Sequence, residues 1–232
     1  MTAVEFLQRG AGRAVHEITA IASSFRQRKT SVLMLHSIGG AEGEFNISTA
    51  SFARLVSCLA DKNIVKGEDV TDAEESFAIT FDDVCGNFYT NAFPLLQTAG
   101  IPFTIFVSLS LLDTPGFIST RMLREISESS LCTVGSHGIN HCFFRHLDEK
   151  AMRAELYDSR EELRNITGRK IELFAFPYGS VYQCGFRHKK LVNEYYRLGF
   201  GTIPAPVTDI SPRYFLPRIN VTEKFIREFC QQ

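Results

Sequence analysis

Short apolar runs alternate with helix-like segments along this chain, and that alternation limits the folds that it can adopt. Apolar or extended runs of strand type lie at 31–36, 77–81, 102–108, 131–136, 171–176, 201–203 and 213–220. Segments of helical pattern lie at 48–62, 87–100, 119–129, 148–168, 188–200 and 222–230. Such alternation predicts a parallel sheet with helical crossovers, either an open doubly wound sheet or a closed barrel.

The pattern continues through the chain without an internal repeat, a low-complexity tract or a linker. The 232 residues therefore predict a single domain over 1–232, in which residues 1–30 form a helical N-terminal extension before the first strand. Neither the oligomeric state nor the role of this extension follows from the sequence.

Composition and charge exclude several classes of partner. Hydrophobic residues make up 44% of the chain and charged residues 22%, which is typical of a globular domain. The net charge is −1 and there is no basic cluster, so nucleic acid is not an expected partner. Because residues 1–30 contain no apolar run long enough for an export signal or a membrane span, we expect a cytoplasmic protein with six reduced cysteines.

Polar residues of catalytic type follow the predicted strands. The first strand ends at His36, the second ends at Asp82 and Asp83, and the fourth and fifth are followed by 135-GSHGINH-141 and 176-FPYG-179. In a parallel sheet or barrel the carboxyl ends of the strands share one rim, where active sites are built. We therefore expect these residues to meet.

His137 and His141 are spaced i, i+4, which would place both imidazoles on one side of a helical turn. Two histidines and one carboxylate can hold a divalent metal with an open coordination position; zinc is the default, and cobalt, nickel or manganese fit the same ligands. One of Asp82 and Asp83 would then bind the metal, and the other would be a free general base near a water molecule. The alternatives are surface histidines, an aspartate turn or cap, and a core histidine at His36.

Three motifs in this chain resemble those of the NodB-homology polysaccharide deacetylases, carbohydrate esterase family 4. The stretch 80-TFDD-83 resembles the first motif of that family, and 136-SHGINH-141 resembles the second, S-H-x-x-x-H. The stretch 175-AFPYG-179 resembles the third, which is usually R-x-P-Y-G. The resemblance covers about residues 31 to 220. It implies a distorted (β/α) barrel with about seven strands.

The resemblance also implies roles for individual residues. Asp82 would be the general base, and Asp83, His137 and His141 would hold the metal. Tyr178 would offer its backbone N–H to the oxyanion of the tetrahedral intermediate. The implied reaction is hydrolysis of the N-acetyl or another N-acyl group of an amino sugar, in the biosynthesis of a surface polysaccharide or lipopolysaccharide.

The sequence departs from the family pattern at two catalytic positions. Ala175 stands where an arginine usually pairs with the catalytic aspartate, and Arg218 is the candidate replacement, with a surface arginine as the alternative. The late histidine that serves as general acid in the family is also not visible. His188 has the surroundings of an exposed helical histidine, which leaves His36 as the other possible proton donor.

The chain has no tryptophan to form the usual aromatic wall of the acetyl pocket, and Phe143, Phe144 and Tyr182 are possible substitutes or ordinary packing residues. We expect Cys85 and Cys142 to be small buried residues, not metal ligands. Two other functions stay open: hydrolysis of a small non-sugar amide, and a non-catalytic barrel that binds metal and sugar. The sequence does not specify the sugar, the acyl group or the native metal.

Overall fold

The computed structural model describes residues 29–40, 43, 45–185 and 189–231. Residues 1–28, which form most of the predicted N-terminal extension, and His188 lie outside these ranges. Within the described part of the chain, no helix is long and apolar enough to cross a membrane.

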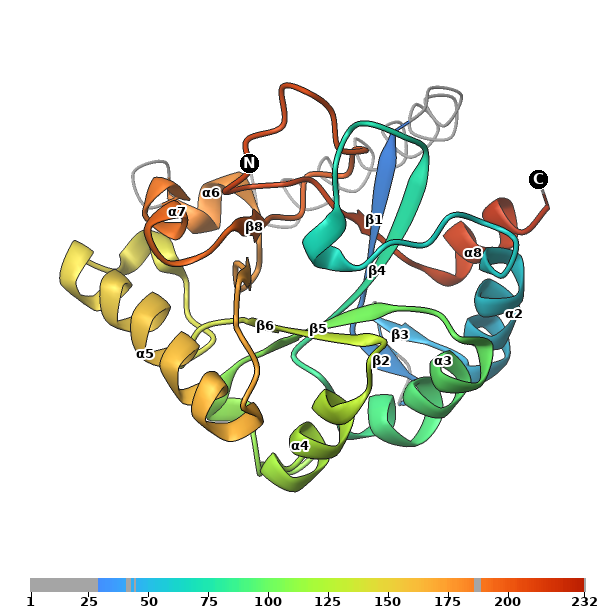
Figure 1. Ribbon diagram of the computed structural model, residues 1–232, viewed down its shortest axis with the longest axis horizontal. Helices are drawn as coiled ribbons and strands as arrows, with labels where there is room; N and C mark the ends of the chain where they lie inside the picture. Colours follow the sequence, from blue (N-terminus) through green and yellow to red (C-terminus); the bar gives the residue numbers. More distant parts are fainter. Residues whose placement is uncertain (1–28, 41–42, 44, 186–188, 232) are drawn as a thin grey trace, which may run out of the picture.

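A seven-stranded parallel sheet forms the centre of the molecule, in the order β8-β7-β6-β5-β4-β1-β9 (Figure 1). Its strands are β1 (Thr30–Leu35), β4 (Ser76–Asp82), β5 (Phe103–Val107), β6 (Cys132–Ser136), β7 (Leu173–Ala175), β8 (Leu198–Phe200) and β9 (Ile219–Asn220). A small second sheet pairs β2 (Ser37–Ile38) with β3 (Asn46–Ile47).

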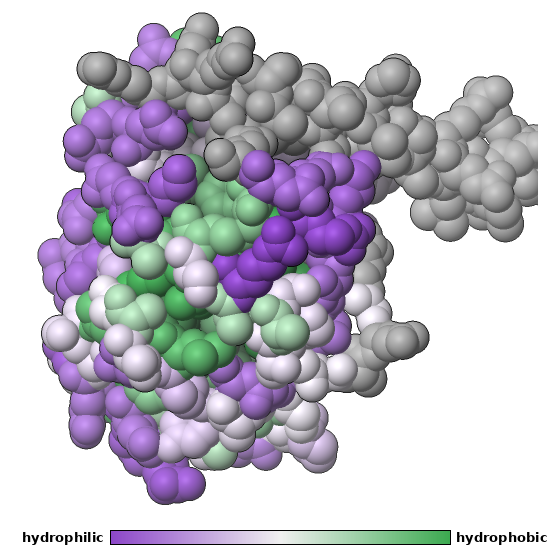
Figure 2. Space-filling model, turned by 90° about the vertical axis from the view of Figure 1, so that its right-hand side faces the viewer, coloured by the Kyte–Doolittle hydropathy of each residue, from purple (hydrophilic) through white to green (hydrophobic). Residues whose placement is uncertain are grey.

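Helices surround the sheet (Figure 1). The longer ones are α2 (Thr49–Leu59), α3 (Phe93–Ala99), α4 (Thr120–Glu128), α5 (Glu149–Thr167) and α8 (Glu223–Phe229). Shorter helical segments are α6 (Val181–Cys184), α7 (Val192–Tyr195), a π-helical turn at Phe88–Ala92 and 3₁₀ turns at Gly67–Asp69, Leu109–Leu111, Phe144–His146 and Lys189–Leu191. Figure 2 shows the side on which α2, α3 and α8 lie, where hydrophilic residues surround a hydrophobic centre.

The segment 213–218 joins the two edges of the sheet. Gly199 in β8 donates a backbone hydrogen bond to Arg213 (2.8 Å) and accepts one from Leu216 (2.7 Å). The same segment continues directly into β9, which pairs with β1 on the opposite edge. The sheet therefore curls into a distorted barrel of seven strands, which confirms the predicted fold class.

Alternation along β4 explains why Asp82 points into the barrel. Phe77, Ile79 and Phe81 pack in the larger hydrophobic cluster, which also contains the buried faces of the surrounding helices. Ala78 belongs to a second, smaller cluster, formed mostly by strand residues. Because side chains alternate along a strand, Asp82 shares the face of Ala78.

The predicted helix 188–200 differs most from the structure. Its described part contains only a 3₁₀ turn and the short α7, and its last residues form β8, immediately before the predicted strand 201–203. The apolar Leu198–Phe200 pairs with β7 along its whole length. Gly199 permits a close approach of the closing segment, since a Cβ there would lie 2.4 Å from the Tyr214 carbonyl oxygen. Barrel closure thus overrides the local helical pattern.

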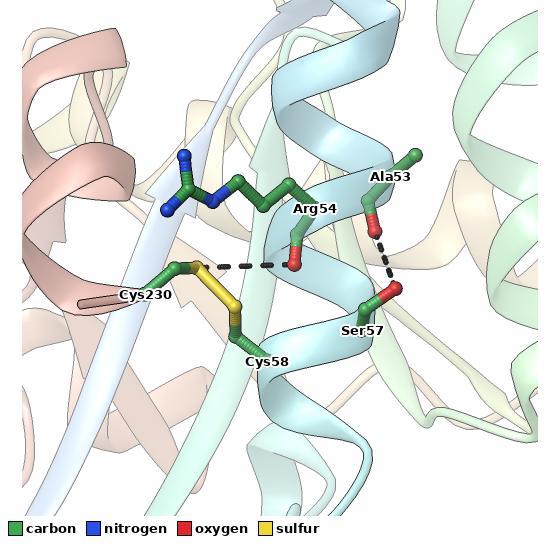
Figure 3. Close-up of a disulfide and its surroundings, with 5 residues drawn as sticks. All are labelled: Ala53, Arg54, Ser57, Cys58 and Cys230. Atoms are coloured by element: carbon green, nitrogen blue, oxygen red, sulfur yellow. Dashed lines mark hydrogen bonds between the residues drawn. A yellow bond between two sulfur atoms is a disulfide. The ribbon is translucent and has the colours of Figure 1, made fainter. Parts of the chain in front are cut away.

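A disulfide links Cys58 in α2 to Cys230 directly after α8 (Figure 3). The Glu223 carboxylate adds polar contacts between the same two helices, because it accepts hydrogen bonds from Ser48 N (2.8 Å) and from the Ser51 hydroxyl. The expectation that all cysteines are reduced is therefore wrong for this pair. The bond closes a loop over a sequence separation of 172, so it constrains nearly the whole described chain.

Reduction of this disulfide should lower the free energy of unfolding by about 2–4 kcal/mol, because the unfolded chain regains the entropy of an open loop. Denaturant unfolding with and without a reductant measures the change. The Cys58→Ala/Cys230→Ala variant is the control, since its unfolding curve should not respond to the reductant. A wild-type curve that does not respond either would contradict the prediction.

Candidate active site

The backbone turns sharply where β4 ends. Asp82 is the last residue of the strand, and Asp83 has φ 61°, in the left-handed region that non-glycine residues seldom adopt. Val84 also has a positive φ (49°), and its N–H donates to the Asp82 carbonyl at 2.7 Å. The turn lets the two adjacent carboxylates enter different environments instead of competing for one.

Asp82 pairs with Arg218 inside the barrel. The guanidinium donates two parallel hydrogen bonds to the carboxylate, Nη1 to Oδ1 and Nη2 to Oδ2, each of 2.7 Å. Its Nε donates to the Gly201 carbonyl (2.9 Å), and Nη1 also reaches the Thr80 hydroxyl (3.2 Å). Arg218 is 0% exposed and Asp82 is 2% exposed, so the alternative of a surface arginine is wrong.

The Arg218 guanidinium sets the charge state of Asp82. Burial alone would raise the pKa of this carboxyl, but the attraction of Arg218, with a smaller contribution from His137, lowers the pKa to about 2. Asp82 is therefore ionised at neutral pH although it is almost completely buried.

Ala175 is fully buried at the end of β7. Its carbonyl oxygen lies 2.8 Å from Nδ1 of His137. A carbonyl can only accept, so Nδ1 carries the proton and Nε2 presents a lone pair toward Asp83. Ala175, which departs from the family pattern, thus still orients a histidine through its backbone, while the arginine comes from the segment directly before β9.

Asp83, His137 and His141 converge on one point. Asp83 Oδ1 lies 3.6 Å from His137 Nε2 and 3.0 Å from His141 Nε2, and the three candidate ligand atoms lie within 4.8 Å of one another. Asp83 Oδ1 is buried, yet none of the described residues gives it a hydrogen bond of good geometry. Two imidazoles and an unsatisfied carboxylate oxygen are a donor set that fits a divalent metal ion.

The two histidines do not lie on a helical turn as their spacing predicted. Residues 137–141 form a loop after β6, in which Gly138 has φ 79° and His141 has φ 46°. Burial lowers the pKa of His137. At His141 burial acts in the same direction, but the negatively charged Asp83 carboxylate, 3.0 Å from Nε2, outweighs it and raises the pKa.

His36 follows β1 and lies beside Asp82, because Leu35 and Phe81 are paired in the parallel register. Its ring contacts Phe45, with centroids 4.8 Å apart. Its Nδ1 is buried and has no hydrogen-bond partner among the described residues. Burial lowers the pKa of His36, against the opposing charges of Asp82 and Asp83.

Aromatic residues form part of the rim. Tyr178, with φ 62°, follows β7, and its ring lies 4.8 Å from that of His141 and stacks on Phe143 at 4.1 Å. Phe143, Tyr178 and Tyr182 are exposed. Phe144 is 1% exposed and packs in the core, so it is not a wall of an acetyl pocket.

The two neighbouring cysteines do not join the cluster of candidate ligands. Burial raises the pKa of Cys85, and it raises that of Cys142 to about 11. Both side chains are half-buried.

One residue beside the site had not been singled out from the sequence. Glu155 in α5 is buried, and its carboxylate accepts hydrogen bonds from the loop between His137 and His141. The signal that could have found it was its position on the helix, because α5 buries Met152, Leu156 and other residues of the same face. An acidic residue at such a position needs a specific partner.

Comparison with known proteins identifies relatives of this arrangement. A family model described as polysaccharide deacetylase matches residues 69–202. YxkH of Bacillus subtilis, which is named for the same family, is 22% identical over 204 residues that cover 84% of this chain and 72% of the relative. The poly-β-1,6-N-acetyl-D-glucosamine N-deacetylase of Staphylococcus epidermidis is 27% identical over 177 residues, covering 67% of this chain and 59% of that relative.

Solved structures share the fold. A polysaccharide deacetylase of Bacillus cereus superposes with a TM-score of 0.76 at 24% identity, over 88% of this chain and 69% of that one. IcaB from Ammonifex degensii superposes with a TM-score of 0.72 at 22% identity, over 89% of this chain and 98% of that one.

Replacing Arg218 with methionine should lower the free energy of unfolding by about 3–5 kcal/mol near neutral pH, because the Asp82 carboxylate would be buried without its counter-ion. Denaturant unfolding measures the loss. Arg213→Met, at an exposed arginine of the same segment, is the matched control and should change stability little. Asp82→Asn combined with Arg218→Met should recover part of the loss; no recovery would contradict a direct interaction between the two side chains.

Proposed function

The chain belongs to the polysaccharide deacetylase family, and from this we propose that it hydrolyses an amide bond and so removes an N-acetyl or another N-acyl group from an amino sugar, with the help of a divalent metal. One observation carries the proposal: two histidines and Asp83 converge beside a second carboxylate, Asp82, that Arg218 keeps separate and ionised. A site for metal binding alone has little use for that second carboxylate.

In this proposal Asp83, His137 and His141 hold the metal, most simply zinc, with cobalt, nickel or manganese as ions that suit the same ligands. The bound ion would supply Lewis-acid polarisation of the carbonyl of the acyl group. The hydrogen bond that His137 Nδ1 donates to the Ala175 carbonyl keeps the imidazole ring oriented toward the site.

Asp82 is the proposed general base. It is ionised at neutral pH and can accept the proton of the attacking water, while Arg218 remains paired to the carboxylate and holds it in place. Tyr178 is the proposed donor to the oxyanion, through its backbone N–H. Its left-handed backbone and its contact with His141 place it at the same rim.

His36 is the proposed donor of a proton to the leaving amine. Its buried Nδ1 has no partner among the described residues, and it lies next to Asp82 on the neighbouring strand. His188, the other candidate, lies outside the described residues.

Poly-β-1,6-N-acetyl-D-glucosamine is the substrate in the names of the staphylococcal relatives, so its oligomers are the first substrates to assay. A substrate in surface polysaccharide or lipopolysaccharide biosynthesis is consistent with this choice. A small non-sugar amide is the alternative, and acetate release from a panel containing both classes separates them.

The cellular compartment remains a prediction. The sequence favoured the cytoplasm, with a nucleotide- or lipid-linked sugar as substrate. The disulfide between Cys58 and Cys230 points the other way, because such bonds persist in oxidising compartments.

Asp82→Asn should reduce the rate of acetate release by about 10²–10⁴-fold, because it removes the proton acceptor. The metal content should stay close to that of the wild type. Asp83→Asn is the contrasting variant, since it should lose the metal. Acetate assays and elemental analysis of the purified proteins measure the two effects. Activity that persists in Asp82→Asn would show that another group is the base.

His36→Phe should reduce kcat by about 10²–10⁴-fold without loss of bound metal, if His36 protonates the amine. An activated ester substrate, whose leaving group needs no proton, should be affected much less. Equal losses on the amide and the ester would assign His36 a packing role instead.

A further inference from the structure

We propose that Glu155 is a positioning residue that holds the loop 138–140, and through it His137 and His141, in the shape that binds metal. The inference rests on the proposed function in one respect, that the loop carries metal ligands. The contacts of Glu155 with the loop do not depend on that function. Glu155 touches neither the candidate ligand atoms nor a substrate, so its effect would pass through the loop.

The loop donates three hydrogen bonds to the carboxylate of Glu155. Oε2 accepts hydrogen bonds from Ile139 N (2.6 Å) and Asn140 N (3.2 Å), and Oε1 accepts one from the Asn140 side-chain amide (2.6 Å). Glu155 itself is 4% exposed. A buried acceptor with three donors from two consecutive residues determines the path of the backbone between the histidines.

The loop would not keep this path from its own sequence. It begins with the left-handed Gly138 and is followed by the left-handed His141, and its N–H groups are outside any helix or sheet. On its other side, the carbonyls of Gly138 and Ile139 accept hydrogen bonds from Leu109 N (3.2 Å) and Ser110 N (2.8 Å). The loop is therefore clamped between α5 and the segment after β5.

Glycine at position 138 belongs to the same arrangement. A Cβ there would lie 2.9 Å from Glu155 Oε2, so a side chain would push the carboxylate away from the loop. The positive φ of 79° adds a second reason for glycine. Gly138 of the motif 136-SHGINH-141 thus leaves room for the Glu155 carboxylate of α5, although 17 positions separate the two residues.

An ionised carboxylate suits these donors better than a neutral polar side chain does. The three loop donors are N–H groups, and an ionised carboxylate can accept at both oxygens. Glutamine could keep all three contacts only if the Asn140 side-chain amide reversed, and the hydrogen bonds would then lose the strength that the carboxylate charge gives them. Burial of a charge is costly, and a helix face that also contains Met152 and Leu156 would otherwise favour an apolar residue.

The test is the affinity of the metal-free full chain for Zn²⁺ alone, measured by competition with a chelator. Glu155→Gln should weaken Zn²⁺ binding by about 10–100-fold, the usual effect of losing a group that orients ligands. Asn140→Ala, which removes one of the three hydrogen bonds at an exposed residue, should weaken it less. Glu162→Gln, at an exposed glutamate of the same helix, is the matched control and should bind as the wild type does.

Amide hydrogen exchange at Ile139 and Asn140 in the metal-free proteins provides a readout that does not depend on metal or activity. Faster exchange in Glu155→Gln, with protection of the β-strands unchanged, supports the inference and excludes general unfolding. Unchanged exchange and unchanged Zn²⁺ affinity would overturn it.

The outcomes separate this inference from the proposed function. If the wild type binds Zn²⁺ but releases no acetate, the proposed reaction fails while the effect of Glu155→Gln on affinity still decides the inference. If the wild type binds no Zn²⁺, metal dependence fails, and hydrogen exchange decides whether Glu155 shapes the loop. If Glu155→Gln does not fold, the milder Asn140→Ala variant takes its place in both measurements.

Discussion

The buried ion pair between Arg218 and Asp82 is the interaction on which the rest of the site depends. It links the segment that closes the sheet to the end of β4. Each charge would be costly there alone, because removing one partner leaves the other desolvated. Closure of the barrel and ionisation of the proposed base are therefore linked. If the segment 213–218 moved away from the sheet, Arg218 would move with it and Asp82 would lose its counter-ion.

Strained backbone is concentrated beside this pair. Asp83, His141 and Tyr178 all have left-handed backbone conformations, each of which costs a residue with a side chain about 1–2 kcal/mol. The strands and the hydrogen bonds of Glu155 hold these turns in place. Three of the residues with proposed roles thus adopt geometries that their local sequences would not favour, which is a pattern expected of a functional site.

Local sequence patterns predicted much of the fold. The apolar runs at β1, β4, β5 and β6 were recognisable because buried parallel strands are continuously hydrophobic, and β4 led directly to the two aspartates. The helical pattern before β8 was misleading, because pairing with β7 and the closing segment decides the conformation of those residues. The disulfide could not be predicted, since the pairing of distant cysteines depends on their positions in the fold.

The amino-acid sequence by itself determined which side chains suit the chemistry and in what order they follow the strands, because motif spacing and strand alternation are local properties. Asp83, His137 and His141 belong to this group. Only the tertiary structure decided which distant residues complete the site. Arg218 replaces an arginine absent at Ala175, and Glu155 shapes a loop from a neighbouring helix. Such contacts depend on how the sheet curls and closes, and no short stretch of sequence contains that information.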